Sequence, residues 1–425
     1  MGRTGRNARG EVSEQVILDA TVALVSRYGF DNTTIARITE ATGRPASSIY
    51  WLFGTKDDLI AAALESSYGG RPLPDPRPWA HFDPDRSRLD QMIDVLTPEM
   101  AVAESEAPLR IGIMLALEGS AQKPQVQAPF QARRGSARER ILRWWGDALS
   151  TAGLKVAIPD STAAQRLTSW TMAFLDGHYV SDVTVSDDAA GPRAHVLAQF
   201  LEATFLRVLA DPDAVGGSPT ALASPRTTQP LPANSDENLL KVTRALIALR
   251  GYEGATIGRI SKQTGLTRSS LYWRYKDKDA LVEAAVAGPF IALMAPLESL
   301  PTPSPDWAQH LASALGETLA TVRVSPNTTK SGLLLKVQRQ DPPTSAGQAI
   351  LDAAVRLERN LAAWLSDAWH SPAGDEHAAH VAWAVTRLLD GLMLGSAFGD
   401  SLDIPAGQAT FQGMLESVHA ALASA

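Results

Sequence analysis

Apolar residues recur every three to four positions through most of the chain, which is the period of an amphipathic helix. In residues 11–28 this stripe includes Val12, Val16 and Leu24, and it ends before Gly29, a residue typical of a helix end. The same stripe returns in residues 239–250, before a second glycine. No segment alternates convincingly in the manner of a strand. We therefore predict an all-α fold.

One stretch of the chain occurs twice, first as residues 34–59 and then as residues 256–281. The copies align without a gap, and a repeat separated by this much chain indicates a duplicated domain rather than a solenoid, whose units span about 20–50 residues. The residues shared by the two copies are Thr34, Ile38, Gly43, Tyr50, Trp51, Lys56 and Leu59, matched by Thr256, Ile260, Gly265, Tyr272, Trp273, Lys278 and Leu281.

The duplication extends beyond the repeated stretch, because Trp145 has a counterpart in Trp364 and the pair Asp176-Gly177 has one in Asp390-Gly391. A segment rich in Pro, Ser, Gly and Thr separates the two halves and is typical of a linker. We predict six regions: a basic flexible arm (1–10), a first head (11–66), a first helical body (67–210), a linker (211–234), a second head (235–287) and a second helical body (288–425).

Composition narrows the class of protein. The 425 residues include no cysteine, which excludes disulfides and thiolate chemistry and agrees with a cytoplasmic location. No run approaches the roughly 18 apolar residues that span a membrane. The net charge of −7 does not exclude nucleic acid, because binding depends on local basic patches.

Each copy of the repeat predicts two short helices joined by a tight turn. Thr34 and Thr256 precede the first short helix, where a hydroxyl caps free backbone amides. Gly43 and Gly265 follow it, and glycine suits a helix that must stop and restart within a few residues. The next helix carries small polar residues and an aromatic pair. This is the pattern of a helix-turn-helix, whose second helix lies in the major groove of DNA.

The spacing T-x-x-x-I, then Gly, Tyr, a further aromatic, Lys and Leu resembles the DNA-binding head of the TetR family of transcription repressors, and it does so in both copies. The resemblance implies a tandem protein with two TetR-like units in one chain, each a DNA-binding head on a helical ligand-sensing body. It also implies which residues contact base edges and phosphates: Thr34, Arg44, Ala46, Ser47, Ser48, Tyr50, Trp51 and Lys56 in the first head, and Thr256, Thr267, Arg268, Ser269, Ser270, Tyr272, Trp273 and Lys278 in the second.

Physical chemistry supports several of these roles. Arg268 can donate to O6 and N7 of one guanine, and a lysine at a helix start favours a phosphate. The alternative is that the aromatic side chains fill the core of the head, which we prefer for Phe53 and Tyr275. For the Tyr-Trp pairs we favour contact with DNA, because a polar-tipped aromatic on a basic face suits a phosphate.

The first head departs from the family pattern at Arg44 and Pro45, where an apolar residue and a Ser or Thr are usual. Proline suits the first position of a helix, so we expect the fold to survive while a hydroxyl cap is lost. Different chemistry in the two heads predicts an operator that is an imperfect palindrome. Three cations of the arm, Arg3, Arg6 and Arg9, are candidates for the minor groove, although a loose terminus is an equally good interpretation.

TetR-like proteins normally pair as homodimers, and tethering makes an intramolecular pseudo-dimer possible, with further self-association open. Residues 163–180 and 380–398 are our choice for the internal interface, although they also suit separate cores. We expect the helical bodies to bind a small apolar or aromatic effector, and a lipid-derived compound is one candidate. Candidate walls, most of which we expect to be plain core, are Met114, Trp144, Trp145, Trp170, Phe174, His178, Leu334, Trp364, Trp383, Met393 and Phe398.

Other classes of function receive less support. No phosphate loop, nucleophile elbow or metal-binding helix motif is present, so the sequence predicts neither an enzyme nor a cofactor or metal site. His377 and His380 follow two acids, a pattern more typical of a solvated helix start than of metal ligands. The stronger alternative is a sensor or protein-interaction module in which one or both heads no longer bind DNA.

Overall fold

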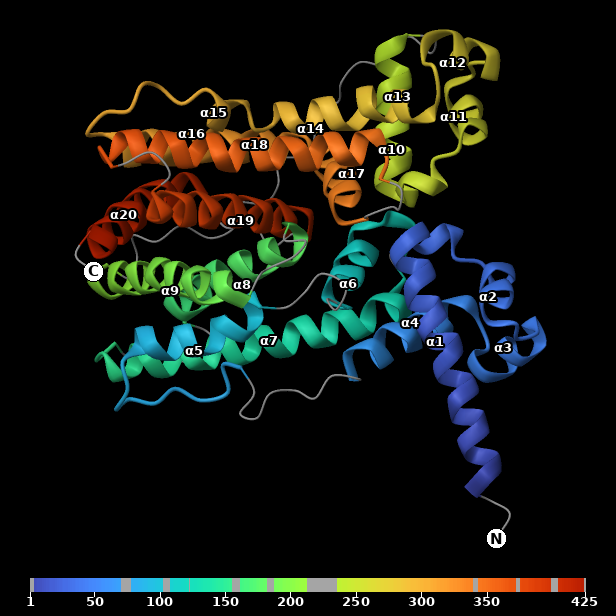
Figure 1. The fold of residues 1–425 in the computed structure, drawn as a ribbon, viewed down its shortest axis with the longest axis horizontal. Helices are drawn as coiled ribbons and strands as arrows, with labels where there is room; N and C mark the ends of the chain where they lie inside the picture. The colour runs from blue at the N-terminus through green and yellow to red at the C-terminus, as the bar shows by residue number, and fades with distance from the viewer. Residues whose placement is uncertain are drawn as a thin grey trace.

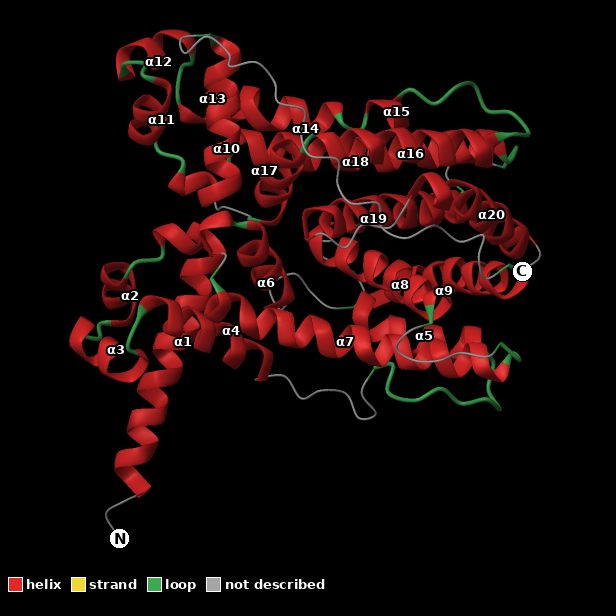
Figure 2. Cartoon of the chain, turned by 180° about the vertical axis from the view of Figure 1, so that it is seen from behind, coloured by secondary structure: helices red, strands yellow, loops and turns green. Residues whose placement is uncertain are grey.

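The structure, a computed structural model, describes residues 4–69, 78–101, 108–121, 123–154, 161–181, 187–211, 235–338, 343–371, 375–398 and 404–423. Within these ranges the chain is helical and contains no strand, as Figure 2 shows, so the all-α prediction is confirmed. Most of the predicted linker, residues 212–234, lies outside the described residues.

The first head consists of α1 (Thr4–Asn32), α2 (Ile35–Thr42), α3 (Ala46–Phe53) and α4 (Lys56–Gly69). Its apolar stripes meet in a small separate core, which buries the side chains of Ile17, Leu18, Ile38, Ile49, Leu59 and Ala63. Burial of these side chains supplies most of the stability of helices too short to persist alone.

One detail of α1 differs from the sequence prediction. The helix begins at Thr4, so residues 4–10 extend it instead of forming an irregular arm, and Figure 1 shows this part projecting beyond the head. No proline interrupts the run, and adding residues to an existing helix costs little. Gly29 leaves the helical conformation with a φ of 73° and a ψ of −178°, as predicted for a helix end, and a further helical turn after this kink brings α1 to Asn32.

The second head repeats this arrangement with α10 (Asp236–Gly254), α11 (Ile257–Thr264), α12 (Arg268–Arg274) and α13 (Lys278–Val282). Gly251, the counterpart of Gly29, kinks α10 in the same way with a φ of 66°. A π-helical turn, η3 (Glu283–Ala287), leads from this head into the second body.

The two bodies are built from corresponding helices. The first contains α5 (Arg88–Met100), α6 (Pro108–Leu117), η2 (Gly119–Ala121), α7 (Pro124–Thr151), α8 (Thr162–Ser181) and α9 (Asp187–Ala210). The second contains α14 (Gly288–Ala292), α15 (Ala295–Glu298), α16 (Trp307–Val324), α17 (Pro326–Val337), α18 (Ser345–Ala368), α19 (Glu376–Phe398) and α20 (Ile404–Ala423). In both bodies the penultimate helix packs on the long helix that precedes it, as α8 does on α7 and α19 on α18.

The bodies meet through α8 and α19, which pack against each other, and through α9 and α20. Figure 1 shows these four helices side by side, with both heads at the same end of the molecule. The crossing of α8 and α19 is close and reciprocal: a Cβ on Gly177 would stand 1.8 Å from the carbonyl oxygen of Arg387, and one on Gly391 would stand 1.7 Å from that of Ala173. Such exchange of equivalent contacts is the mark of a two-fold interface.

One helix of the described ranges, α19, is long and apolar enough to cross a membrane, but 83% of its apolar window is buried inside the protein. It packs against α8 on one side and α18 on another. Its apolar character is therefore explained by its place at the centre of the molecule.

Candidate functional site

The turn between the two short helices has the same construction in both heads. Thr34 accepts a hydrogen bond from the amide of Arg37 at 3.3 Å, and Thr256 accepts one from Arg259 at 3.3 Å. Gly43 and Gly265 adopt left-handed φ angles of 65° and 72° at the ends of α2 and α11. The predicted caps and turn glycines are thus confirmed, and they fix the angle at which α3 and α12 leave the turn.

The starts of α3 and α12 differ. The hydroxyl of Thr267 accepts from the amide of Ser270 at 3.1 Å, whereas Pro45 makes no side-chain cap. The cation beside the proline, Arg44, is only partly exposed, and within the described residues its buried Nε has no hydrogen-bond partner. Arg268, by contrast, is exposed, and its guanidinium passes over Gly258 of α11. Arg268 of the second head is therefore more exposed to solvent than Arg44 of the first.

The aromatic pairs lie on the outer surface. Trp51 is 84% exposed and Trp273 is 87% exposed, and about half of each neighbouring tyrosine, Tyr50 and Tyr272, is accessible. Among the small residues of α3 and α12, Ala46, Ser47, Ser48 and Ser269 are exposed, and Ser270 is partly so. This exposure argues against a core role for the Tyr-Trp pairs. Phe53 and Tyr275, in contrast, are partly buried and pack against the hydrophobic cores, as expected.

The two lysines expected to hold phosphates point inward in this structure. The Nζ of Lys56 donates to the carbonyl of Phe30 at 2.6 Å and lies 4.2 Å from the centre of its ring. Lys278 lies 3.8 Å from the ring centre of Tyr252, the counterpart of Phe30. Burial lowers the pKa of both lysines, that of Lys278 to about 8. Each lysine thus lies against the kinked end of the first helix of its head and must turn outward to reach a phosphate.

The second head carries more exposed positive charge. Lys276 is exposed in the turn between α12 and α13, where the first head has Gly54. Lys262 is likewise exposed at the position where the first head has the acidic Glu40. Lys276 was not among the residues predicted from the sequence to contact DNA, although the run Lys276-Asp277-Lys278 indicated local positive charge. The side chains of Arg3, Arg6 and Arg9 lie outside the described residues.

A buried polar junction that sequence reasoning missed links the heads to the bodies. Glu118, which follows α6, accepts from the amide of Phe30 at 2.9 Å, just past the kink of α1. Gln338, which follows α17, donates to the carbonyl of Arg27 at 3.4 Å. These are equivalent positions of the two units, and a Cβ on Gly29 or Gly251 would lie 3.1–3.6 Å from polar atoms of both side chains. Nothing in the local sequence signals this junction, because it joins four helices from both units.

An ion pair ties the heads to each other across the same junction. Arg250 of α10 donates to Asp31 of α1 at 2.5 Å. The helices α1 and α10 also pack together directly. The heads are consequently held as one assembly, and their spacing depends on the ends of α6 and α17.

The residues chosen as pocket walls form the core. Trp144 and Trp145 pack edge to face with ring centres 4.8 Å apart, and Trp170 stacks on Phe411 across the two units. The indole of Trp364 donates to the carbonyl of Pro301 at 2.7 Å. The other candidates are buried or lie against neighbouring rings at the unit interface: Met114, Phe174, His178, Leu334, Trp383, Met393 and Phe398.

Hollows in the bodies lie elsewhere. In the second body a hollow lies between α14, α17, α18 and α19, and a smaller one lies at the interface of the two bodies, between α7, α8 and α19. None of the eleven candidate walls lines either of them. Periodicity identified these large apolar residues as buried but could not distinguish a filled core from the wall of a cavity.

Comparison with known proteins agrees with the geometry of the heads. The family model described as "Bacterial regulatory proteins, tetR family" matches residues 17–63 and again residues 239–285. One relative, the HTH-type transcriptional repressor AcnR of Corynebacterium efficiens, is 38% identical over 50 residues. That match covers 12% of this chain and 27% of the relative, so it spans about a quarter of the relative's length.

The two family matches coincide with the two helix-turn-helix heads, and each head is followed by a helical body of corresponding construction. The chain therefore belongs to the TetR family, in a tandem form in which two TetR-like units are fused in one polypeptide.

Proposed function

We propose that this protein is a transcriptional repressor that binds its operator with both heads and leaves it when an effector binds in the bodies. The family supports DNA binding, and the name of the relative supports repression. The observation that carries the proposal is the presence of exposed Tyr-Trp pairs on α3 and α12 of two heads held at one end of the molecule.

The fused chain acts as an intramolecular pseudo-dimer in this proposal. The reciprocal crossing at Gly177 and Gly391 supports it, since equivalent residues exchange equivalent contacts. Two recognition helices held in this way read half-sites one DNA turn apart, about 34–36 Å. Tethering makes the pairing independent of protein concentration.

The operator is an imperfect palindrome, because the two recognition helices differ in chemistry. Thr267 and Arg268 stand in the second head where Pro45 and Ala46 stand in the first. Arg268 reads a guanine, while Trp51 and Trp273 pack against sugar or a thymine methyl. The effector is small and apolar or aromatic over most of its surface, and the protein works in the cytoplasm, where the operator lies.

A gel shift and footprint on DNA upstream of the protein's own coding sequence test the proposal. The expected result is one protected region with two half-sites related by an approximate two-fold axis. Tyr272→Ala and Trp273→Ala weaken binding by about 10- to 100-fold each, because Tyr272 loses a hydrogen bond to a charged phosphate, worth about 1.5–3 kcal/mol, and Trp273 loses its packing on sugar or a thymine methyl. Val355→Ala, an exposed apolar residue on α18, is the matched control and leaves binding unchanged.

Two outcomes separate the alternatives. Loss of binding with Tyr272→Ala but not with Tyr50→Ala would mean that only the second head reads DNA, and would contradict a protein that binds with both heads. Failure of the protein to shift either this DNA or any sequence from a random pool would overturn the repressor and favour a sensor or interaction module.

The segment preceding the first head has its own test. Deleting residues 1–10 removes Arg3, Arg6 and Arg9 and, if they enter the minor groove, lowers affinity and flattens the salt dependence. An unchanged slope of affinity against salt would remove these arginines from the DNA contacts.

A further inference from the structure

The helix that joins the second head to its body is interrupted by a proline. Pro289 lies in the first turn of α14, directly after η3, and Ser67 stands at the corresponding place of the first unit. Proline has no amide proton, and its ring collides with the carbonyl four residues earlier, here that of Ala285. The helix widens instead, and the amide of Gly288 donates to the carbonyl of Glu283, five residues back. Residues 283–290 thus form a joint that the first unit lacks, since α4 runs on there as a regular α-helix.

An arginine of the second head bonds the carbonyl that the proline leaves without a donor. The Nε of Arg244, on α10, donates to the carbonyl of Ala285 at 2.7 Å. Arg244 is partly buried and forms no ion pair within the described residues, and burial lowers its pKa. A charged donor makes one of the stronger hydrogen bonds that a buried backbone oxygen can accept. Val22 stands at the place of Arg244 in the first unit, where the helix needs no such donor.

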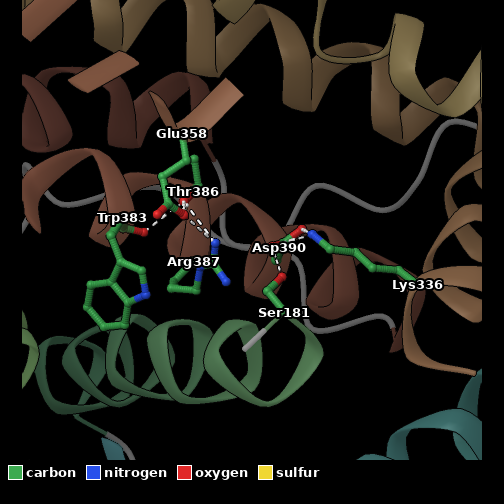
Figure 3. A network of polar contacts seen from close by, with 7 residues as sticks. All are labelled: Ser181, Lys336, Glu358, Trp383, Thr386, Arg387 and Asp390. Carbon is green, nitrogen blue, oxygen red and sulfur yellow. Dashed lines mark hydrogen bonds and ion pairs between the residues drawn. The ribbon is translucent and has the colours of Figure 1, made fainter. Parts of the chain in front are cut away.

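The body side of the joint is held tightly. Phe290 is buried, and a Cβ on Gly332 of α17 would stand 2.0 Å from its ring. The helix α17 is itself anchored, because the buried Lys336 donates to both oxygens of Asp390 on α19 at 2.7 Å, as Figure 3 shows. The hydroxyl of Ser181, on α8 of the first unit, donates to the same carboxylate. The joint therefore starts from a fixed point beside the interface of the two bodies.

Two connections to the body set the direction of the second head. Its first helix, α10, packs on α17, and its last helix, α13, continues through η3 into α14. The hydrogen bond from Arg244 to Ala285 ties these connections together, because it links α10 to η3. The helices α11 and α12 lie between α10 and α13 in the chain, so the direction of α12 depends on both.

We propose that Arg244 is a positioning residue for the second recognition helix. It takes the place of the amide that Pro289 lacks, keeps the joint in its π form and so fixes the direction of α12. The first head has a continuous connecting helix and no such residue, so the two heads are oriented by different means. The joint itself follows from contacts within the chain, and only its effect on DNA rests on the proposed function.

Distances between the two heads test this positioning on the full chain in the absence of DNA. The chain has no cysteine, so nitroxide labels attach only at Ala41→Cys on α2 and Gln263→Cys on α11, which are equivalent exposed positions. Pulsed electron paramagnetic resonance then measures the distribution of distances between the labels. The labelled protein is expected to give one narrow distribution. Arg244→Met should broaden it, because the joint is then no longer tied to α10.

Pro289→Ser restores the missing amide and gives the second unit the residue of the first. The connecting helix should then become regular, so the distribution shifts to a new, equally narrow maximum and Arg244 is no longer needed. Adding Arg244→Met to Pro289→Ser should leave this distribution unchanged.

Broadening by Arg244→Met of the same size with and without Pro289→Ser would overturn the proposal, and so would one unchanged distribution in all the variants. Because Pro289→Ser removes a residue that breaks helices, it provides a stable variant even where Arg244→Met alone fails to fold. The shift of the maximum then decides the matter.

The effect on DNA is measured by selection from operators with varied spacing between the half-sites. Arg244→Met should broaden the range of spacings bound and lower affinity about tenfold, if the freed head is correctly placed about one tenth of the time. Pro289→Ser should move the preferred spacing and keep it sharp. Arg356→Met, which removes an exposed cation of α18, is the control and changes neither.

A loss of affinity with an unchanged spacing preference would mean that Arg244 only stabilises the head, and would overturn the positioning role. Label distances that respond as expected in a protein that binds no DNA would support the joint and count against the proposed function alone.

Discussion

Gly177 of α8 and Gly391 of α19 lie at equivalent points of one helix crossing, each against a carbonyl oxygen of the opposite helix. The side chain of alanine at either position would require the two backbones to separate, since its Cβ would stand less than 2 Å from that oxygen. The two helices can approach this closely only because both positions are glycine, which has a hydrogen atom where alanine has a methyl group.

Gly391→Ala is expected to destabilise the pairing of the bodies by about 3 kcal/mol or more, because the clash is with backbone that cannot rotate away. The measurement is thermal unfolding, together with affinity for a two-half-site operator. Gly135→Ala on α7 is the control, since a Cβ there meets nothing within 4 Å and only gains helix propensity. Equal melting temperatures for Gly391→Ala and the control would contradict the close crossing.

Lys276→Gln is expected to weaken operator binding and to reduce the slope of log affinity against log salt by about one, because an exposed cation beside α12 neutralises one phosphate. Arg356→Gln, an equally exposed cation on α18 of the body, should leave the slope as it is. A salt slope that responds equally to both substitutions would remove Lys276 from the interface.

Lys278 gives the second head a pH dependence whose sign follows from its pKa, which burial lowers from 10.5 to about 8. Between these values the unfolded chain binds more protons than the folded one, so the contribution of Lys278 to the unfolding free energy rises with pH. Lys278→Met should thus raise the melting temperature most at pH 7 and progressively less toward pH 10.

The comparison for this prediction is Lys276→Met, which removes an exposed lysine of the same head. Its effect on the melting temperature should vary little over the same range. A difference between Lys278→Met and the unsubstituted protein that stays constant from pH 7 to pH 10 would show that the ammonium is not desolvated.

Glu118→Ala is expected to cost about 1–3 kcal/mol of stability, because the buried amide of Phe30 loses its acceptor. It should also broaden the range of half-site spacings that the protein binds, since the end of α6 then no longer holds α1. Glu118→Gln keeps an acceptor and matches Gln338, so it should retain the original spacing. Selection of bound sequences from a library with variable spacers measures the half-site spacing that each variant prefers. Identical spacing preferences in all three proteins would contradict a positioning role.

Much of the fold and of the heads could be predicted from the residues alone. The gapless repeat indicated the duplication, Gly43 and Gly265 predicted the turns, and Thr34 and Thr256 predicted the caps, because a turn or a cap depends only on residues close to it in the sequence. The outward orientation of the Tyr-Trp pairs was also expected, from the family resemblance and from their polar-tipped aromatic character, and all four side chains are exposed.

Features that join distant segments required the tertiary structure. The inward turn of Lys56 and Lys278 and the junction of Glu118 with Gln338 depend on which helix ends meet. The hollow of the second body depends on Ala353 facing the side chains of α19. The sequence determined two helical units with DNA-reading heads, because helix period and capping are local. Tertiary structure decided which polar groups meet and which spaces stay empty, because those depend on packing between helices far apart in the chain.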